Sequence, residues 1–310
     1  MVGSDDFSFP AEPSDAGVRL DVFLGGRLRE TSRSQAAYLI EGGHARVNGL
    51  ARKPGYRLKA GDVVTGSLPA PQPTGFLPEP IPLDRLYEDA DMVVINKPAG
   101  LVVHPAPGHR SGTLVNALLY HCPDLAGIGA ELRPGIVHRL DKDTTGTLVV
   151  AKRAAALENL AAQFKHRTVR KDYLALVHGA MQGASGRVRL AIGRHPVDRK
   201  RMSTRSRAGR EAETAWCVRQ AFAGASLLEL RLHTGRTHQI RVHCAAIGHP
   251  ILGDPVYGRR AGDPPGLQRQ MLHALRLELD HPRTGERMTF ESPLPADMRE
   301  VIEELAAEVG

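Results

Sequence analysis

Apolar residues follow two spacings along this 310-residue chain, and the two spacings predict different elements. Apolar positions three and four residues apart indicate amphipathic helices, whereas alternating or short continuous apolar runs indicate strands. The helical spacing covers residues 20–28, 36–40, 113–119, 155–166 and 296–309. The strand-like runs cover residues 45–49, 57–64, 91–96, 135–137, 147–151, 170–177, 225–232 and 272–277. Both kinds of element are therefore expected along most of the chain.

A proline-rich stretch divides these elements into two groups. Six prolines lie between residues 69 and 82, a composition typical of a semi-rigid, extended linker at a domain boundary. Residues 1–16 are polar, with Asp, Ser, Glu and Pro, and we expect them to be disordered. The sequence thus predicts a small domain at residues 17–68 and a large one at residues 83–310.

The composition narrows the class of protein. Hydrophobic residues make up 42% of the chain and charged residues 24%, as in ordinary soluble globular proteins. No run of eighteen apolar residues exists to span a membrane, and an N-terminus with Asp5 and Asp6 does not resemble a signal peptide. We therefore expect a cytoplasmic protein. Its net charge of +7 favours a polyanionic partner, either a nucleic acid or an acidic membrane surface.

The positive charge is concentrated in two segments. From Arg19 to Lys59 there are nine basic residues and three acidic ones, and from Arg187 to Arg210 nine basic residues and one acidic one. Such a run is often a solvated surface, but this density is more typical of a surface that binds phosphates.

Cysteine and histidine usage gives no support for a metal or a cofactor. The three cysteines, Cys122, Cys217 and Cys244, form neither a disulfide framework nor a metal-binding pair. His238 and His243 lie near Cys244, but their spacing and the lack of a further ligand do not match a zinc site. No glycine-rich nucleotide motif occurs, so we expect no cofactor.

A charged turn between two apolar runs is the strongest candidate for chemistry. Residues 138–146, HRLDKDTTG, separate the runs 135–137 and 147–151, and they hold the carboxylates Asp141 and Asp143 among basic neighbours. Turns between buried strands often carry catalytic groups. The spacing alone is equally consistent with an exposed hairpin whose charges are solvated, and Asp143 suits a turn residue that binds its own backbone.

The motif HRLDKDTTG resembles the active-site signature of the RluA-type RNA pseudouridine synthases. Three further stretches resemble motifs of that family and follow in its order: NKPAGLVVHP at 96–105, TGRTHQIRVH at 234–243 and GHPILGD at 248–254. Within the first of these, Lys97 and His104 are equally consistent with turn residues and with substrate contacts. Residues 17–68, with SRSQAAYLIEGGHARVNG followed by YRLKAGDVV, resemble the S4-like RNA-binding domain.

This resemblance implies both a fold and an activity. The fold would be α+β, with a catalytic domain built on a mixed, mostly antiparallel sheet with a central cleft, and a small α/β S4-like domain. The activity would be the isomerisation of uridine to pseudouridine, most readily in large-subunit ribosomal RNA, by a monomer. Alternatives are a transfer-RNA-directed enzyme of the same family and a catalytically silent RNA-binding or ribosome-assembly protein. A carboxylate-pair glycosidase fits less well, because Asp141 and Asp143 are too close on one turn.

The resemblance also assigns roles to individual residues. Asp141 would be the catalytic carboxylate, Arg241, expected on a strand, would keep it ionised, and Tyr173 would stack on the uracil and assist proton transfer. Without the resemblance, Tyr173 reads as a core residue. Arg139 would fill the space left by a flipped base. Further substrate-binding candidates are His138, Arg236, Arg33, Arg46, Lys200 and Arg201.

Overall fold

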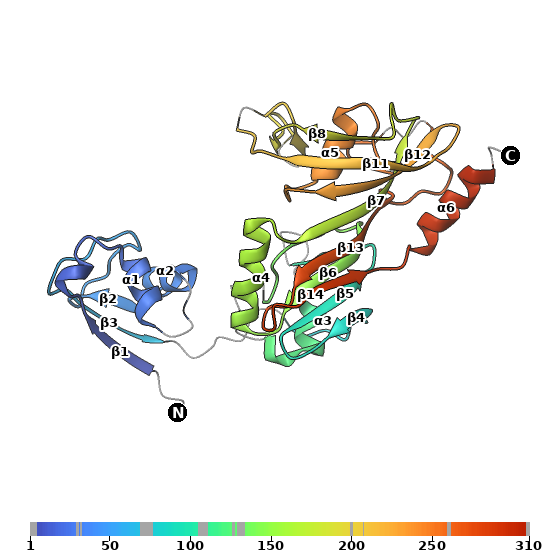
Figure 1. Ribbon diagram of the computed structural model, residues 1–310. Coiled ribbons are helices and arrows are strands. Elements are labelled where there is room, and N and C mark those ends of the chain that lie inside the picture. The colour runs from blue at the N-terminus through green and yellow to red at the C-terminus, as the bar shows by residue number, and fades with distance from the viewer. Residues whose placement is uncertain are drawn as a thin grey trace. The chain divides into compact units, whose positions relative to one another are not determined.

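The computed structural model describes residues 5–28, 31, 33–68, 77–104, 111–125, 128, 134–198, 201–206, 208–258 and 262–307. The chain divides into two compact units, residues 1–77 with 123–134, and residues 78–122 with 135–310 (Figure 1). No helix in the described ranges is both long and apolar enough to cross a membrane.

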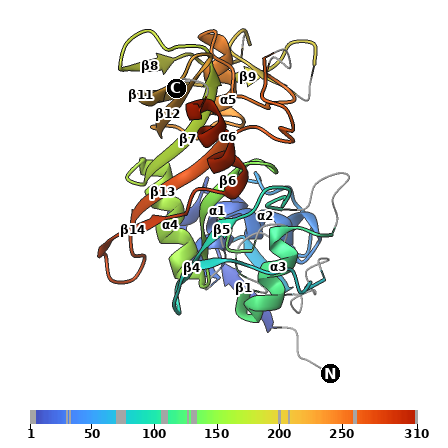
Figure 2. The same ribbon diagram turned by 90° about the vertical axis from the view of Figure 1, so that its right-hand side faces the viewer.

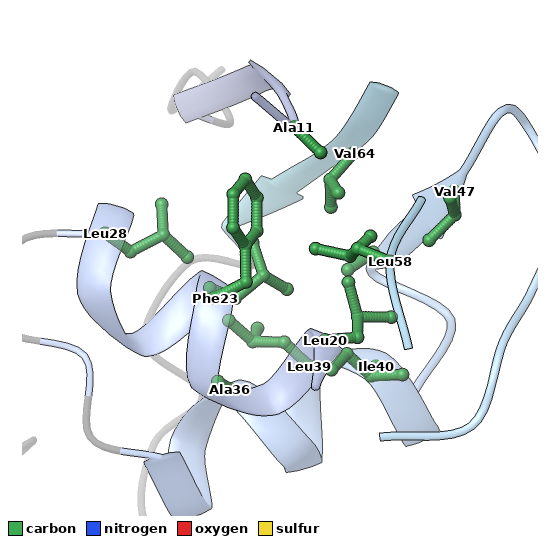
Figure 3. Packing of buried hydrophobic residues seen from close by; sticks show 12 residues of the cluster. Ala11, Leu20, Phe23, Leu28, Ala36, Leu39, Ile40, Val47, Leu58 and Val64 are labelled. Atoms are coloured by element: carbon green, nitrogen blue, oxygen red, sulfur yellow. The ribbon is translucent and has the colours of Figure 1, made fainter. Parts of the chain in front are cut away.

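The first unit is a three-stranded antiparallel sheet with two helices. Its elements are β1 (Asp5–Pro10), α1 (Leu20–Arg27), α2 (Arg33–Glu41), β2 (Ala45–Val47) and β3 (Val63–Leu68), with short 3-10 helices η1 (Pro13–Asp15) and η2 (Pro123–Leu125). The sheet order is β1-β3-β2. Buried apolar side chains from α1, α2, β2, β3 and the adjoining loops form its core, which includes Leu20, Phe23, Leu39 and Leu58 (Figure 3).

Strand β1 corrects the expectation that residues 1–16 are disordered. Residues 5–10 pair along their whole length with β3, and the half-buried side chains Phe7 and Phe9 pack against the core of this unit. Their rings stack with centroids 5.6 Å apart. The alternation of aromatic and polar residues in FSFP was the signal for a strand, although the acidic and proline-containing surroundings suggested disorder.

The second unit is built on a nine-stranded sheet. Its elements are β4 (Arg85–Glu88), β5 (Met92–Lys97), α3 (Leu114–His121), β6 (Thr145–Ala151), α4 (Ala154–His166), β7 (Arg170–His178), β8 (Ser185–Arg189), β9 (Gly193–Arg194), β10 (Met202–Ser203), β11 (Glu213–Ala221), β12 (Ala225–Leu232), α5 (Gln239–Ala246), β13 (Leu272–Asp280), β14 (Arg287–Glu291) and α6 (Ala296–Ala307). The strand order is β4-β5-β6-β13-β7-β12-β11-β8, with β14 paired to β13, while β9 and β10 form a separate hairpin.

This arrangement confirms the predicted α+β class with a mostly antiparallel sheet. Within the described residues, β6 and β13 are the parallel pair of the large sheet, and the other pairings in it are antiparallel. Strands β7 and β13 run side by side through the middle of the unit (Figure 2). Helix α4 packs on β6 and buries Ala156 and Leu160 against the apolar side chains of β5, β6 and β13.

The parallel pair needs a glycine at the end of the HRLDKDTTG motif. Gly146 has φ +110° and pairs with both Ala274 of β13 and Lys97 of β5. A Cβ atom at Gly146 would lie only 2.2 Å from the carbonyl oxygen of Ala274, far inside van der Waals contact. The close approach of these strands therefore places the turn that carries Asp141 beside Lys97, near the start of the NKPAGLVVHP motif.

Two expected elements differ from the structure. The predicted strand at 135–137 is reduced to an isolated bridge between Ile136 and Val150. The HQIR segment, expected to be a strand, begins helix α5, which packs beside β11 (Figure 1). His238 precedes this helix with φ +55°, in the left-handed region, so the chain turns sharply before the helix begins.

Candidate active site

Asp141 lies in the turn that leads into β6, and Arg241 of α5 reaches it. The Nη1 group of Arg241 donates a hydrogen bond to Oδ2 of Asp141 over 3.0 Å. The Asp141 side chain is 18% exposed and that of Arg241 only 6%, so the carboxylate borders the surface while its cation is buried. A buried guanidinium beside a carboxylate favours the ionised acid, which is the form a nucleophile or base requires.

A second carboxylate holds the other side of the same guanidinium. Asp254, whose side chain is fully buried, accepts hydrogen bonds from Nε and Nη2 of Arg241 at 2.7 and 2.8 Å. The backbone N–H groups of Val256 and Tyr257 also donate to Asp254. This bidentate pairing fixes the plane of the guanidinium, so that Nη1 points at Asp141.

Asp141, Arg241 and Asp254 form a triad, and the pKa values of Arg241 and Asp254 follow from burial and from their pairing. Burial alone would favour neutral forms of both partners. The hydrogen bonds and charge of Asp254, together with the charge of Asp141, outweigh it and raise the pKa of Arg241. Likewise burial acts to raise the pKa of Asp254, but Arg241 and the two backbone N–H groups lower it below the ordinary value. Arg241 and Asp254 are thus both charged at neutral pH.

Helix α5 is fixed to β11 in the orientation that this contact needs. The side-chain amide of Gln239 donates to the carbonyl oxygen of Glu213 and to the hydroxyl of Thr214. One turn further on, the ring of His243 is hydrogen-bonded to the Thr214 hydroxyl over 2.9 Å. These buried contacts explain why a segment rich in polar residues is found inside the fold.

Tyr173 lies on β7 and is 7% exposed. Burial raises the pKa of its phenol, and the negative charge of Asp141 raises it further, so the group keeps its proton at neutral pH. The structure therefore places Tyr173 within the electrostatic influence of Asp141. The burial of the ring is equally consistent with the alternative interpretation of Tyr173 as a core residue.

Two buried basic side chains hold the backbone of the turn that carries Asp141. The Nζ atom of Lys97 donates to the carbonyl oxygens of Pro98, Leu101 and Lys142 at 2.8, 2.9 and 2.8 Å. Arg269 donates to the carbonyl oxygen of Asp143 at 3.2 Å. The carbonyl groups of Lys142 and Asp143 are thus tied to the end of β5 and to the loop before β13, respectively.

Arg269 has a further anchor in the last helix. Its Nε and Nη2 donate to both carboxylate oxygens of Asp297, in the first turn of α6, at 2.7 and 2.8 Å. The neighbouring Gln270 donates to the hydroxyl of Thr144. From the sequence, Lys97 was equally consistent with a turn residue and a substrate contact, and Arg269 was not identified, because the role of each depends on contacts with distant backbone carbonyls.

Lys97→Met is expected to change how stability depends on pH. Burial lowers the folded pKa of Lys97 to about 7 from the ordinary 10.5. The unfolded chain then binds this proton more tightly than the folded chain, so the lysine adds stability progressively as pH rises from about 7 to about 10. Urea unfolding at several pH values should show the stability of wild type growing relative to that of the variant over this range. A difference that does not vary with pH would contradict the assignment.

The remaining predicted residues of this unit differ in their surroundings. Arg139 is exposed and makes no hydrogen bond or ion pair with the part of the chain that the structure describes. His138 accepts a hydrogen bond at Nε2 from the backbone of Val149 and stacks on Phe164, so its contacts favour packing over substrate binding. Arg236 donates to the carbonyl oxygen of Glu211, away from Asp141.

Arg201 and the candidates of the first unit have other partners. The guanidinium of Arg201 lies 5.3 Å from the ring centre of Tyr257, which also faces Arg241 at 5.2 Å. In the first unit, Arg33 is paired with Asp21 at 3.1 Å. Arg46 is exposed on β2. Lys200 lies outside the described residues.

A cluster elsewhere in this unit has residue types that bind metals. The ligand atoms of Asp89, Asp91 and His281 lie within 4.8 Å of one another. His281 accepts backbone N–H groups at Nδ1, which leaves its proton on Nε2 for the hydrogen bond to Asp89, and Arg283 pairs with Asp91. With these contacts neither ring nitrogen has a lone pair to offer, so the cluster fits a structural network rather than a metal site.

Comparison with protein families finds two matching regions, which correspond to the two domains predicted from the motifs. Residues 91–246 match the model of the RNA pseudouridylate synthase family, and residues 18–64 match that of the S4 domain. The four motifs and the triad of Asp141, Arg241 and Asp254 lie in or directly after the first of these regions.

Relatives cover nearly the whole chain. An uncharacterized RNA pseudouridine synthase of Bacillus subtilis, YlyB, is 49% identical over 95% of this chain and 96% of its own length. The ribosomal large subunit pseudouridine synthase D of Pseudomonas aeruginosa is 45% identical over 91% of this chain and 90% of its own. Among solved structures, human RNA pseudouridylate synthase domain containing 4 aligns with a TM-score of 0.58 at 27% identity, over 72% of this chain and 93% of that one.

Proposed function

The chain belongs to the RNA pseudouridylate synthase family, and from this premise we propose that it converts specific uridines of large-subunit ribosomal RNA to pseudouridine, with Asp141 as the catalytic carboxylate. The observation that carries the proposal is the contact between Asp141 and Arg241, whose guanidinium is fixed by Asp254. A partly exposed carboxylate that accepts a hydrogen bond from a buried, fixed guanidinium has the arrangement expected of a catalytic group.

The geometry suits the isomerisation chemically. The reaction breaks the bond between the uracil nitrogen and the ribose, turns the base, and rejoins it through carbon, which then loses a proton. It requires a carboxylate and a group that handles the proton. Asp141 supplies the first, and the phenol of Tyr173, which burial keeps protonated, is the nearby acid that the sequence prediction proposed for the second.

Access to the base requires that the uridine leaves its stack. Extruding a nucleotide costs a few kcal/mol, and an inserted side chain can occupy the vacated space. Two observations support Arg139 for this role: its side chain is exposed, and it lies two residues before Asp141. We therefore assign base flipping to Arg139.

Ribosomal RNA is the favoured target for two reasons. Several relatives that share 42–46% of their residues with this chain are called ribosomal large subunit pseudouridine synthase D. In addition, the S4 domain at residues 18–64 supplies a separate module for binding RNA. Transfer RNA is the alternative target for the same chemistry.

Tritium release tests the reaction and its target together. Ribosomal and transfer RNA labelled at C5 of uridine lose tritium when that carbon is joined to the ribose. We expect release from large-subunit ribosomal RNA and little from transfer RNA. Release from transfer RNA alone would retain the reaction but refute the target, and release from neither, with RNA still bound, would favour a silent RNA-binding protein.

Deleting residues 1–68 is expected to weaken RNA binding without abolishing chemistry on short substrates. The core of the first unit is made by residues between Ala11 and Val64, so the deletion removes a self-contained core. It also removes the nine basic residues between Arg19 and Lys59, and each lost phosphate contact reduces the salt dependence of log K by about 0.9. Filter binding at several salt concentrations, beside tritium release from a short hairpin, measures both effects. Undiminished affinity would show that the second unit binds RNA alone.

A further inference from the structure

His238 lies next to the catalytic carboxylate, on the side that Arg241 leaves open. Arg241 contacts Oδ2 of Asp141, whereas Nε2 of His238 is 3.8 Å from the other oxygen, Oδ1. A carboxylate held by one hydrogen bond can still rotate about that bond. A second donor at Oδ1 would fix its plane, and such contacts are often long in the absence of substrate.

The Tyr257 hydroxyl is the partner of the other ring nitrogen of His238. The backbone N–H of Met202 donates to the Tyr257 hydroxyl over 2.8 Å, and that hydroxyl lies 2.9 Å from Nδ1 of His238. Because Met202 occupies one lone pair of the hydroxyl oxygen, this arrangement favours a hydroxyl hydrogen directed at Nδ1. With Nδ1 as the acceptor, the proton of a neutral imidazole is on Nε2, facing Asp141.

The surroundings of the pair keep this arrangement in place. The Tyr257 ring meets the His238 ring edge-on at 5.7 Å and lies against the guanidinium groups of Arg201 and Arg241. Burial lowers the pKa of His238, with the charges of Asp141 and Asp254 opposing and those of Arg241 and Arg139 adding to the effect. The ring is therefore neutral at physiological pH and can act as a donor without adding a charge.

The backbone of His238 is a further sign that its position matters. Its φ of +55° places a side chain other than glycine in the left-handed region. Such conformations are strained and persist where the surrounding structure demands them.

We propose that His238 is a positioning residue for Asp141, held by the Tyr257 hydroxyl as the Nε2–H tautomer so that it donates to Oδ1 and fixes the plane of the carboxylate. The proposal rests on the proposed function and adds two residues to it, His238 and Tyr257. Neither exchanges a proton with the substrate.

The tautomer is tested without reference to activity. Nitrogen-15 spectra of the full-length protein with labelled histidine distinguish a protonated from an unprotonated ring nitrogen. We expect Nε2 of His238 to carry the proton in wild type, and Tyr257→Phe to give a mixture of both tautomers. A proton on Nδ1 in wild type would overturn the proposal.

The effect on catalysis is tested with Tyr257→Phe and a matched control. We expect Tyr257→Phe to lower kcat about tenfold with KM little changed, since only the hydroxyl is lost. The control is Tyr87→Phe, on β4, which removes a phenol hydroxyl that donates to Asp89. Its kcat should match that of wild type. Unchanged kcat in Tyr257→Phe, beside an active wild type, would refute the positioning role alone. Absence of tritium release by wild type would refute the proposed function and this role with it.

Two substitutions of His238 separate the effect of its Nε2 hydrogen bond from the effect of its left-handed backbone conformation. The amide N–H of Gln reaches the position of Nε2, whereas that of Asn corresponds to Nδ1. Asn is the better residue for a left-handed backbone. We therefore expect His238→Gln to retain about ten times more kcat than His238→Asn, against the backbone preference. Equal or greater activity in His238→Asn would overturn the proposal.

Discussion

Asp141→Asn is expected to reduce tritium release by about 10³-fold or more, the size of effect seen when an essential catalytic group is removed. The amide oxygen of asparagine can still accept the hydrogen bond from Arg241, and Asp254 still holds the guanidinium. The variant should therefore fold and bind RNA as wild type does. It lacks only the anionic oxygen that can attack or take a proton.

Asp143→Asn is the matched control for this result. The same chemical change is then made two residues away, in the same turn, at a residue whose backbone carbonyl is held by Arg269. We expect activity close to that of wild type. Loss of tritium release in Asp143→Asn with activity retained in Asp141→Asn would move the catalytic role to Asp143, the alternative that the sequence alone leaves open.

Arg241→Met is expected to lower both activity and stability. The substitution leaves the buried side chain of Asp254 without its cation, and breaking a buried pair in this way typically costs about 3–5 kcal/mol. Activity should also fall, because Asp141 loses the guanidinium that donates to its Oδ2. Chemical unfolding and tritium release measure the two losses, and the double variant Arg241→Met/Asp254→Asn should recover stability but not activity.

The pH dependence of the stability lost in Arg241→Met identifies the cause of that loss. In wild type the pKa of Asp254 is lowered, so its pairing stabilises the fold at neutral pH and this contribution is lost as pH falls through the folded pKa. In Arg241→Met only the two backbone N–H groups still oppose burial, so that pKa should rise. The destabilisation should then be largest at neutral pH and shrink in acid. An equal loss at every pH would indicate a packing defect instead.

The turn at Asp141 could be predicted because its signals are local. The apolar run 147–151 became strand β6 and the periodic segment 155–166 became helix α4, with Asp141 in the polar turn before them. The family resemblance then named Arg241 as its partner, which the structure places 3.0 Å from it. The catalytic role of Asp141 stays a prediction until the variants are measured.

Helix α5 was expected to be a strand for a physical reason. The β-branched residues Ile240 and Val242 alternate with polar ones, and this pattern favours strands. In the structure all residues from 239 to 244 are buried, because Gln239, Arg241 and His243 find polar partners inside the protein. A helix buried on all sides shows no polar face from which its period can be read.

The other supports of the site carry no such local signal. Lys97 binds the carbonyl of Lys142, which is 45 residues away, and Tyr257 meets His238 across 19 residues. Asp254 ends the GHPILGD motif, which was noted without a role for its carboxylate. These contacts exist only once the sheet has formed, so spacing along the chain cannot reveal them.

The parallel pairing of β6 with β13 sets the order in which the protein matures during synthesis. Thr145 of β6 is hydrogen-bonded to His273 of β13, so β6, which already has β5 on one side, waits for 128 further residues before its parallel neighbour exists. The core of the first unit is complete by Val64. Domains fold as they emerge from the ribosome, N-terminal first, and long-range pairings form late. The nascent chain thus acquires its RNA-binding module well before it acquires an active site.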